Sequence, residues 1–138
     1  MAKKKTTDLP ADNPRSDYWL KKADALWHEI IHAATGSGCI ISNANCKGAL
    51  EAHHLISKSV RSTRHSLTNG VLLCAEHHRH DKYLSAHNGI VWFEKWMAQN
   101  RPAQWAWVLR YRNNVGRVDY RAAAKSLERM KRGSRHAV

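Results

Sequence analysis

Apolar residues recur every three or four positions in several stretches of this chain, the spacing that gathers them on one face of an α-helix. The first stretch covers residues 17–35, and Ser16 before it is a suitable N-cap. Further stretches fill residues 89–132, where Pro102 is well placed in a first helical turn and Asp119 can cap the last stretch. The pattern therefore predicts flanking helices over residues 17–35 and 89–132.

Between these helices the apolar positions form two short runs, separated by a polar, basic loop over residues 57–68. The first run ends in a pair of adjacent histidines, and the second covers residues 71–73. Residues 75–83 then return to a helical pattern. We expect an α+β fold in which a strand, loop, strand and short helix, over about residues 39–87, are embedded among the flanking helices.

The length of 138 residues fits one domain of ordinary size. We expect residues 16–138 to form it and residues 1–15 to be a disordered basic arm, because no apolar run makes this segment a secretory signal. No stretch approaches the roughly 20 apolar residues of a membrane helix. Three cysteines, an odd number, argue against a disulfide framework, so we expect a cytoplasmic protein with reduced or metal-bound thiols.

The net charge of +12 is concentrated at one end of the chain. Residues 101–138 hold ten Lys and Arg against two acidic residues, which supplies +8 of the total. Such clustering favours a polyanionic partner, most simply DNA; RNA fits the same charge, and a merely solvated tail is the alternative. The residues expected to contact phosphates lie in the basic loop and on the last helix: Lys58, Arg61, Arg64, Arg121, Lys125, Arg129 and Arg132.

The cysteines and one histidine suggest a structural metal site. Cys74 and His77 have the C-x-x-H spacing that forms one half of many zinc sites. Cys39 and Cys46, in a turn-rich loop before the first strand, would have to supply the other half, and six residues separate them where two to four are usual. Two interpretations stay open: a four-ligand structural Zn²⁺ site, or small buried apolar side chains without metal.

A second group of polar residues follows the order of the predicted strands and short helix. His53 and His54 end the first strand, Asn69 opens the second fifteen positions later, and His78 lies nine residues beyond it. This arrangement resembles the HNH endonucleases, and residues 18–27 with the cysteine-bearing loop are loosely similar to small phage-type HNH proteins such as NinG-type recombination nucleases. The resemblance implies a ββα-metal (His-Me finger) core and a bacteriophage protein acting in the host cell cytoplasm.

The resemblance also implies a role for each matching residue. His53 would be a metal ligand and His54 the general base, which suits a histidine because its pKa lies near working pH. Asn69 would tie the loop and help to orient the base, although Asn69-Gly70 by itself is also a common turn dipeptide. His78 would be the second ligand. The implied reaction is metal-dependent hydrolysis of DNA phosphodiesters to 5′-phosphate and 3′-hydroxyl ends, in phage DNA processing or recombination.

The third metal ligand departs from the family pattern. Where many HNH sites have a histidine one helical turn after the second ligand, this chain has Lys82, which cannot bind a metal while charged. Asp81, three residues after His78 and on the same helical face, is the expected substitute, and His87 is the competitor. The metal would be Mg²⁺ or Mn²⁺, with Zn²⁺ or Ni²⁺ as alternatives.

Two other functions fit parts of the sequence. A non-catalytic nucleic-acid-binding module, with histidines and cysteines around a structural Zn²⁺, explains the charge without cleavage. Separately, His28, Glu29 and His32 match the HExxH pattern of zinc metalloproteases. Three fixed positions recur often by chance, and a protease would not explain the basic tail. We therefore expect His28 and His32 to be surface residues of the first helix.

Overall fold

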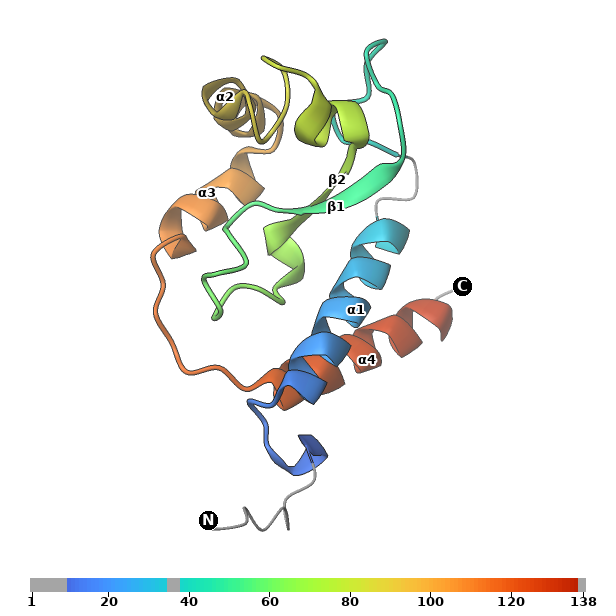
Figure 1. The fold of residues 1–138 in the computed structure, drawn as a ribbon, viewed down its shortest axis with the longest axis vertical. Coiled ribbons are helices and arrows are strands. Elements are labelled where there is room, and N and C mark those ends of the chain that lie inside the picture. Colours follow the sequence, from blue (N-terminus) through green and yellow to red (C-terminus); the bar gives the residue numbers. More distant parts are fainter. Residues whose placement is uncertain (1–9, 35–37, 137–138) are drawn as a thin grey trace, which may run out of the picture.

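A small two-stranded sheet lies between two groups of helices in the computed structural model, which describes residues 10–34 and 38–136 (Figure 1). The longer elements are α1 (Asp17–Ala34), β1 (Leu50–His54), β2 (Gly70–Cys74), α2 (Ile90–Asn100), α3 (Pro102–Tyr111) and α4 (Tyr120–His136). The shorter ones are η1 (Pro10–Asp12), η2 (Leu67–Asn69) and the π-helical turn η3 (Glu76–His80). This mixture of helices and antiparallel strands confirms the expected α+β class.

The two strands pair antiparallel, in a register that places His53 opposite Val71 and His54 opposite Gly70. Because side chains alternate along a strand, the adjacent histidines point to opposite faces of the sheet. Every residue of β2 is buried, whereas β1 is half-buried or exposed along its length. The hairpin therefore combines one core strand with one partly exposed strand that carries two half-buried histidines.

One face of the hairpin packs against α1, and α4 packs across α1 beside it (Figure 1). The buried residues of this core are Trp19, Ala23, Leu26, Trp27, Ile31, Tyr120, Ala124 and Leu127. Gly70 permits the close approach of α1, because a Cβ at this position would lie 2.7 Å from the Trp27 ring. The Gly70 backbone is extended, with φ −119° and ψ 141°. Asn69 ends the η2 turn and Gly70 begins β2, so Asn69-Gly70 does not form a hairpin turn.

The other face packs against α2 and the loop that follows α1. Its buried residues are Cys39, Ile41, Val71, Leu73, Cys74, Ala86, Phe93 and Met97. The Ile40 amide donates a hydrogen bond to the Leu72 carbonyl at 2.9 Å, and the Ala75 amide donates to the Ala49 carbonyl at 2.8 Å. These bonds hold the cysteine-bearing loop against β2, so that Cys39 and Cys46 come close to the strand that ends in Cys74.

The helix predicted over residues 75–83 is wrong in its length. Its regular part is one π turn, closed by a 2.9 Å hydrogen bond from the Asp81 amide to the Glu76 carbonyl. Asp81 then turns to an extended backbone, and its carboxylate accepts hydrogen bonds from the amides of Tyr83 and Leu84 at 2.8 and 2.7 Å. An aspartate that bonds the next backbone amides in this way competes with continuation of the helix.

The disordered arm predicted over residues 1–15 is wrong in its last part, because Pro10–Asp12 forms a 3₁₀ turn. Trp19 Nε1 donates to the Ala11 carbonyl at 2.8 Å, and Arg15 Nε donates to the Val118 carbonyl at 3.2 Å. Residues 1–9 of the predicted arm and residue 35 of the predicted first helix lie outside the described residues.

The flanking helices agree with the hydrophobic pattern. The first runs to Ala34, and the region 89–132 contains α2, α3 and the greater part of α4. Pro102 occupies the first turn of α3, and the Asp119 carboxylate caps α4 by accepting from the Ala122 amide at 2.8 Å. Among the described helices, none combines the length and apolar character needed to cross a membrane.

Candidate metal centres and active site

Three thiols and one imidazole meet where the cysteine-bearing loop touches the end of β2. The Nδ1 atom of His77 lies 3.8 Å from the Sγ of Cys39, 3.5 Å from that of Cys46 and 3.2 Å from that of Cys74. The four ligand atoms all lie within 4.8 Å of one another, and the cysteines form no disulfide. This set of three sulfurs and one nitrogen could hold a metal ion such as Zn²⁺.

The burial of His77 fits a metal better than an apolar core. The residue is fully buried, and its Nε2 atom has no hydrogen-bond partner within the described part of the chain. Its Nδ1 faces three sulfur atoms, which are weak hydrogen-bond partners. Since buried polar groups are normally paired, coordination through Nδ1 gives this imidazole a partner that an apolar site would not. Of the two interpretations of these cysteines, the metal site is the one that the geometry favours.

Three further histidines form a separate group beside β1. His78 Nε2 lies 3.1 Å from His53 Nδ1 and 3.1 Å from His87 Nε2, and the three ligand atoms lie within 4.8 Å of one another. His53 comes from β1, His78 from η3 and His87 from the loop before α2. That loop folds back onto η3 through a 3.1 Å bond from the His87 amide to the His78 carbonyl. Three converging imidazole nitrogens are a recurrent ligand set for a divalent ion.

The carboxylate of Glu51 sets the orientation of His78. His78 Nδ1 lies 2.8 Å from Glu51 Oε1, and this hydrogen bond lowers the pKa of Glu51. An ionised carboxylate only accepts, so Nδ1 carries a proton, and the neutral tautomer of this ring would turn the lone pair of Nε2 towards His53 and His87. A carboxylate behind a metal-binding histidine fixes its tautomer in this way. Glu51 and His53 lie two positions apart on one strand face, a signal that could have identified Glu51 from the sequence.

The protonation states of the group also suit metal binding. Burial, followed by repulsion from His78 and His87, lowers the pKa of His53 to about 3. Burial also lowers the pKa of His87, with His78 again contributing. Neutral imidazole is the form that binds metals, and a depressed pKa keeps these rings neutral at pH 7.

Asp81 does not join His53 and His78, contrary to the sequence-based expectation. The helix that would have placed it on the face of His78 ends at that residue, and its carboxylate bonds the amides of Tyr83 and Leu84. These backbone hydrogen bonds lower the pKa of Asp81. His87, named from the sequence as the competitor, lies beside His53 and His78 instead.

His54 lies on the opposite sheet face, against α1. Its Nε2 atom lies 3.0 Å from the Arg64 carbonyl, which only accepts, so Nε2 donates and Nδ1 carries a lone pair. The ring stacks on Trp27 with centroids 3.8 Å apart and planes 8° apart. Burial lowers the pKa of His54 to about 4, although the bond to Arg64 opposes this shift. The result is a neutral histidine with one unprotonated nitrogen.

Asn69 holds the loop that positions the Arg64 carbonyl. Its side chain is fully buried, accepts a hydrogen bond from the Ile56 amide, and donates to the carbonyls of Ile56 and Thr63 at 3.1 Å each. Thr63 precedes Arg64, whose carbonyl receives the His54 hydrogen bond. Asn69 thus ties the start of the loop to the segment before Arg64, which agrees with the loop-tying role that the family resemblance implied.

One cavity of about 550 Å³ connects the two faces of this site. His53, His54, His78 and His87 all line it, together with two basic side chains, Lys58 and Arg79, and one acidic side chain, Glu94. His28, which sequence reasoning assigned only to the helix surface, is exposed but also lines the cavity. The cavity is therefore large enough for part of an anionic polymer, and it is lined both by His54 and by the group of His53, His78 and His87.

The HExxH pattern does not assemble into a metal site among the described residues. The Glu29 carboxylate, which would activate water in a metalloprotease, pairs with Lys131 of α4 at 2.7 Å. His28 and His32 belong to neither group of candidate metal ligands.

The predicted phosphate-contacting residues have separate locations. Lys58 lines the histidine cavity and Arg61 lines a second cavity. Arg64 instead forms a bidentate ion pair with Asp24, at 2.9 and 2.7 Å, which ties the loop to α1. On α4, Arg121 is half-buried, whereas Lys125, Arg129 and Arg132 are exposed. Arg64, predicted to contact phosphate, is thus engaged in holding the loop against α1.

Comparison of the chain with models of protein families, with curated proteins and with solved structures found no match. The chemistry of the site therefore comes from its residues: two groups of metal-type ligands, a neutral histidine beside one of them, and basic side chains around the shared cavity.

Proposed function

We propose that this chain is a metal-dependent endonuclease of the HNH type, with a ββα-metal core, that hydrolyses DNA phosphodiester bonds to 5′-phosphate and 3′-hydroxyl ends. The observation that carries the proposal is that two adjacent histidines have different surroundings on the two faces of one strand. His53 belongs to a group of three imidazoles, and its neighbour His54 has an unprotonated nitrogen and lines the same cavity.

The candidate ligands of the catalytic ion are His53 Nδ1, His78 Nε2 and His87 Nε2. A divalent ion held there would neutralise phosphate charge and stabilise the leaving 3′ oxygen. The donor set is entirely nitrogen, and imidazole suits Zn²⁺ and Ni²⁺ better than Mg²⁺, which prefers oxygen ligands. The ligands therefore favour Zn²⁺ or Ni²⁺, which the sequence suggested only as alternatives to Mg²⁺ and Mn²⁺.

His54 acts in this proposal as the general base. Its Nδ1 atom accepts a proton from the attacking water, while Nε2 stays bonded to the Arg64 carbonyl. The resulting imidazolium keeps that hydrogen bond and lies over the face of Trp27, where a cation is stabilised by the ring. A phosphate diester bound in the cavity adds negative charge nearby, which raises the low pKa of His54 towards working pH.

A plasmid-cleavage assay on the wild type and His54→Ala tests this function. Each protein is incubated with Ni²⁺, Zn²⁺, Mn²⁺ or Mg²⁺, or with EDTA, and binding to the same DNA is measured in parallel. We expect metal-dependent cutting by the wild type that His54→Ala loses while still binding. His80→Ala is the matched control, because His80 is exposed on the same η3 turn as His78 and belongs to neither ligand group.

The second candidate is a non-catalytic nucleic-acid-binding module stabilised by zinc. The group of Cys39, Cys46, Cys74 and His77 favours it, because that group needs no reaction to explain it. This candidate predicts tight DNA binding with no cutting under any metal, and no difference between the wild type and His54→Ala. Cutting that survives unchanged in pure His54→Ala would instead remove His54 from the mechanism.

A further inference from the structure

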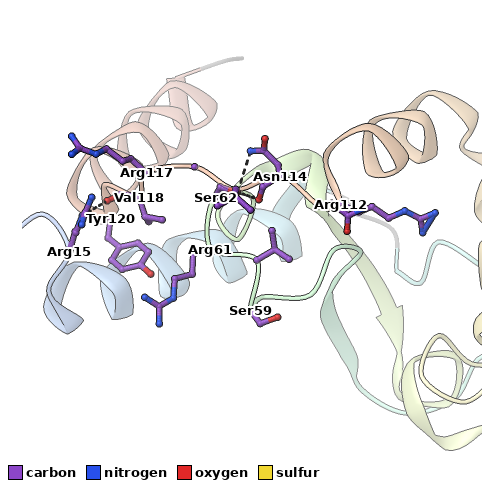
Figure 2. A pocket seen from close by; sticks show the side chains of 13 residues that line it. Arg15, Ser59, Arg61, Ser62, Arg112, Asn114, Arg117, Val118 and Tyr120 are labelled. Atoms are coloured by element: carbon purple, nitrogen blue, oxygen red, sulfur yellow. Dashed lines mark hydrogen bonds between the residues drawn. The ribbon is translucent and has the colours of Figure 1, made fainter.

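A second cavity, of about 880 Å³, lies where three distant parts of the chain meet (Figure 2). One wall is Arg15, just before α1; another is the loop from Ser59 to Ser62; the third is the connection 112–118 between α3 and α4. Tyr120, the first residue of α4, also lines it. We call this cavity the arginine cleft.

The charge of the arginine cleft has one sign. Four arginines line it, namely Arg15, Arg61, Arg112 and Arg117, and no aspartate or glutamate does. Figure 2 shows Arg15, Arg61 and Arg117 around Tyr120, while the Arg112 side chain extends away from them. All four arginines are exposed, and within the described residues no carboxylate forms an ion pair with them. Their guanidinium groups are thus available to an anion.

Hydrogen bonds fix the shape of the cleft. Ser62 Oγ donates to the Asn114 carbonyl at 2.9 Å, and Asn114 Nδ2 lies 3.3 Å from Ser62 Oγ, which joins the loop to the α3–α4 connection (Figure 2). Arg15 Nε donates to the Val118 carbonyl at 3.2 Å, which leaves its two terminal NH₂ groups for a ligand. A site whose walls are held in place loses less conformational entropy when it binds.

The cleft is connected to the histidine cavity through one short loop. Lys58 lines the histidine cavity, and Arg61, three residues later, lines the cleft. Three residues span at most about 11 Å even when fully extended. This loop is more compact than that, because the Val60 amide bonds the Ser57 carbonyl at 2.9 Å and the Arg64 amide bonds the Arg61 carbonyl at 3.3 Å. Successive charges on one nucleic acid strand advance by about 3.4 Å, so at most about three nucleotides separate the two positions along this loop.

We propose that the arginine cleft binds the phosphate backbone of a nucleic acid strand, within about three nucleotides of the position that faces the histidines. Arginine forks match phosphate geometry and pair with it by two parallel hydrogen bonds. The volume and the spread of the four arginines over three segments fit several phosphates in a row rather than one small ion. The inference rests on the proposed function for the identity of the strand, but the binding itself requires no cleavage.

The test measures binding rather than cutting. All proteins carry His54→Ala, and affinity for a labelled 30-base-pair DNA duplex is measured by fluorescence anisotropy over a range of salt concentrations, with an RNA duplex of equal length in a second arm. The cleft variant is Arg61→Gln with Arg117→Gln. The matched control is Arg101→Gln with Arg110→Gln, which removes the same charge from exposed arginines that line neither cavity. Thermal melting confirms that each variant folds.

We expect the cleft variant to reduce the slope of log K against log salt by about 2, since each lost phosphate contact lowers it by about 1, and to weaken binding at least tenfold at low salt. The control should change neither quantity by as much as half of this. An equal loss of affinity in both variants would show that only net charge matters, and it would overturn the proposal that the cleft binds phosphates. A loss confined to the RNA arm would support the cleft but reject DNA as its strand. If the cleft variant loses affinity as expected but the wild type cuts no DNA, the proposed nuclease activity is rejected and the phosphate site in the cleft is retained.

Discussion

The imidazole of His54 lies flat on the indole of Trp27, with ring centroids 3.8 Å apart. Trp27 is fully buried in the core between α1 and α4, and its Nε1 atom donates to the Ser66 carbonyl at 2.9 Å. One tryptophan therefore anchors the helices, the loop that carries the Arg64 carbonyl and the proposed general base. The position of the proposed base is therefore tied directly to the packing of the core.

Replacing Trp27 tests whether its aromatic face supports the protonated base. Trp27→Leu and Trp27→Phe both lose core volume and the bond to Ser66, so each should lower the free energy of unfolding by about 2–4 kcal/mol. Trp27→Leu should also have a kcat about tenfold below that of Trp27→Phe, because a cation over an aromatic face gains about 1–2 kcal/mol. Cleavage rates at a temperature where both variants are folded decide this. Equal kcat values would mean that the indole serves only to fill space.

The stability of the protein should depend on pH through His54. Its pKa is about 4 in the folded chain, against about 6.5 in an unfolded one. Between these values the unfolded chain binds a proton that the folded chain does not, so the free energy of unfolding falls as the pH falls through this window. Above pH 6.5 this contribution is fully present and constant.

Urea midpoints at pH 7.5, 5.5 and 4.5 measure this effect. His54→Gln should lose less stability than the wild type over this range. Part of the dependence should remain in the variant, because the pKa values of His53 and His65 are lowered in the same direction. Comparing the two proteins isolates His54, since it is not a candidate metal ligand. An unchanged pH dependence in His54→Gln would contradict its burial as a neutral group.

Glu51→Ala should weaken the histidine metal site without emptying the cysteine site. The carboxylate that orients His78 is lost, and changes of this kind typically cost 10- to 100-fold in metal affinity. Glu51→Gln, which keeps a carbonyl acceptor, should lose less. Calorimetric titration with Ni²⁺ or Zn²⁺ gives the affinities, and Glu128→Gln on α4 is the control. If Glu51→Ala binds as tightly as the wild type, the 2.8 Å contact does not serve metal binding.

Replacing Cys74 tests whether its thiol is a zinc ligand or only a small buried side chain. If Cys74 is a ligand, Cys74→Ala should remove one zinc per chain in elemental analysis and lower the Tm strongly, because the metal closes the end of the hairpin. The wild type should then lose a similar amount of stability when treated with a strong chelator. A merely buried thiol predicts a loss of only about 1 kcal/mol and no response of either protein to the chelator.

Much of the fold follows from local patterns that the sequence displays. Regular apolar spacing predicted the flanking helices, and two short apolar runs predicted β1 and β2. The short helix was overestimated because periodicity cannot show that Asp81 bonds the following amides and ends the turn. Residues 10–15 were assigned to an arm because their partners, such as Val118, are distant in the sequence.

The candidate site was only partly predictable for the same reason. The family resemblance placed His53, His54 and His78 in order, but the choice between Asp81 and His87 depended on how the loop folds back onto η3. The pairing of Arg64 with Asp24 joins residues forty positions apart, which no spacing rule indicates. Long-range contacts of this kind decide which charged residues are free to meet a ligand.

The π turn η3 places two consecutive histidines in different metal groups, His77 among the cysteines and His78 beside His53. A single peptide unit thus joins the two groups of candidate ligands, so a shift of the backbone at one histidine also moves the other. An ion seated among the sulfurs would therefore hold the backbone of η3 and, through it, the position of His78. We therefore expect that filling the cysteine group would favour binding of a second ion at the histidine group.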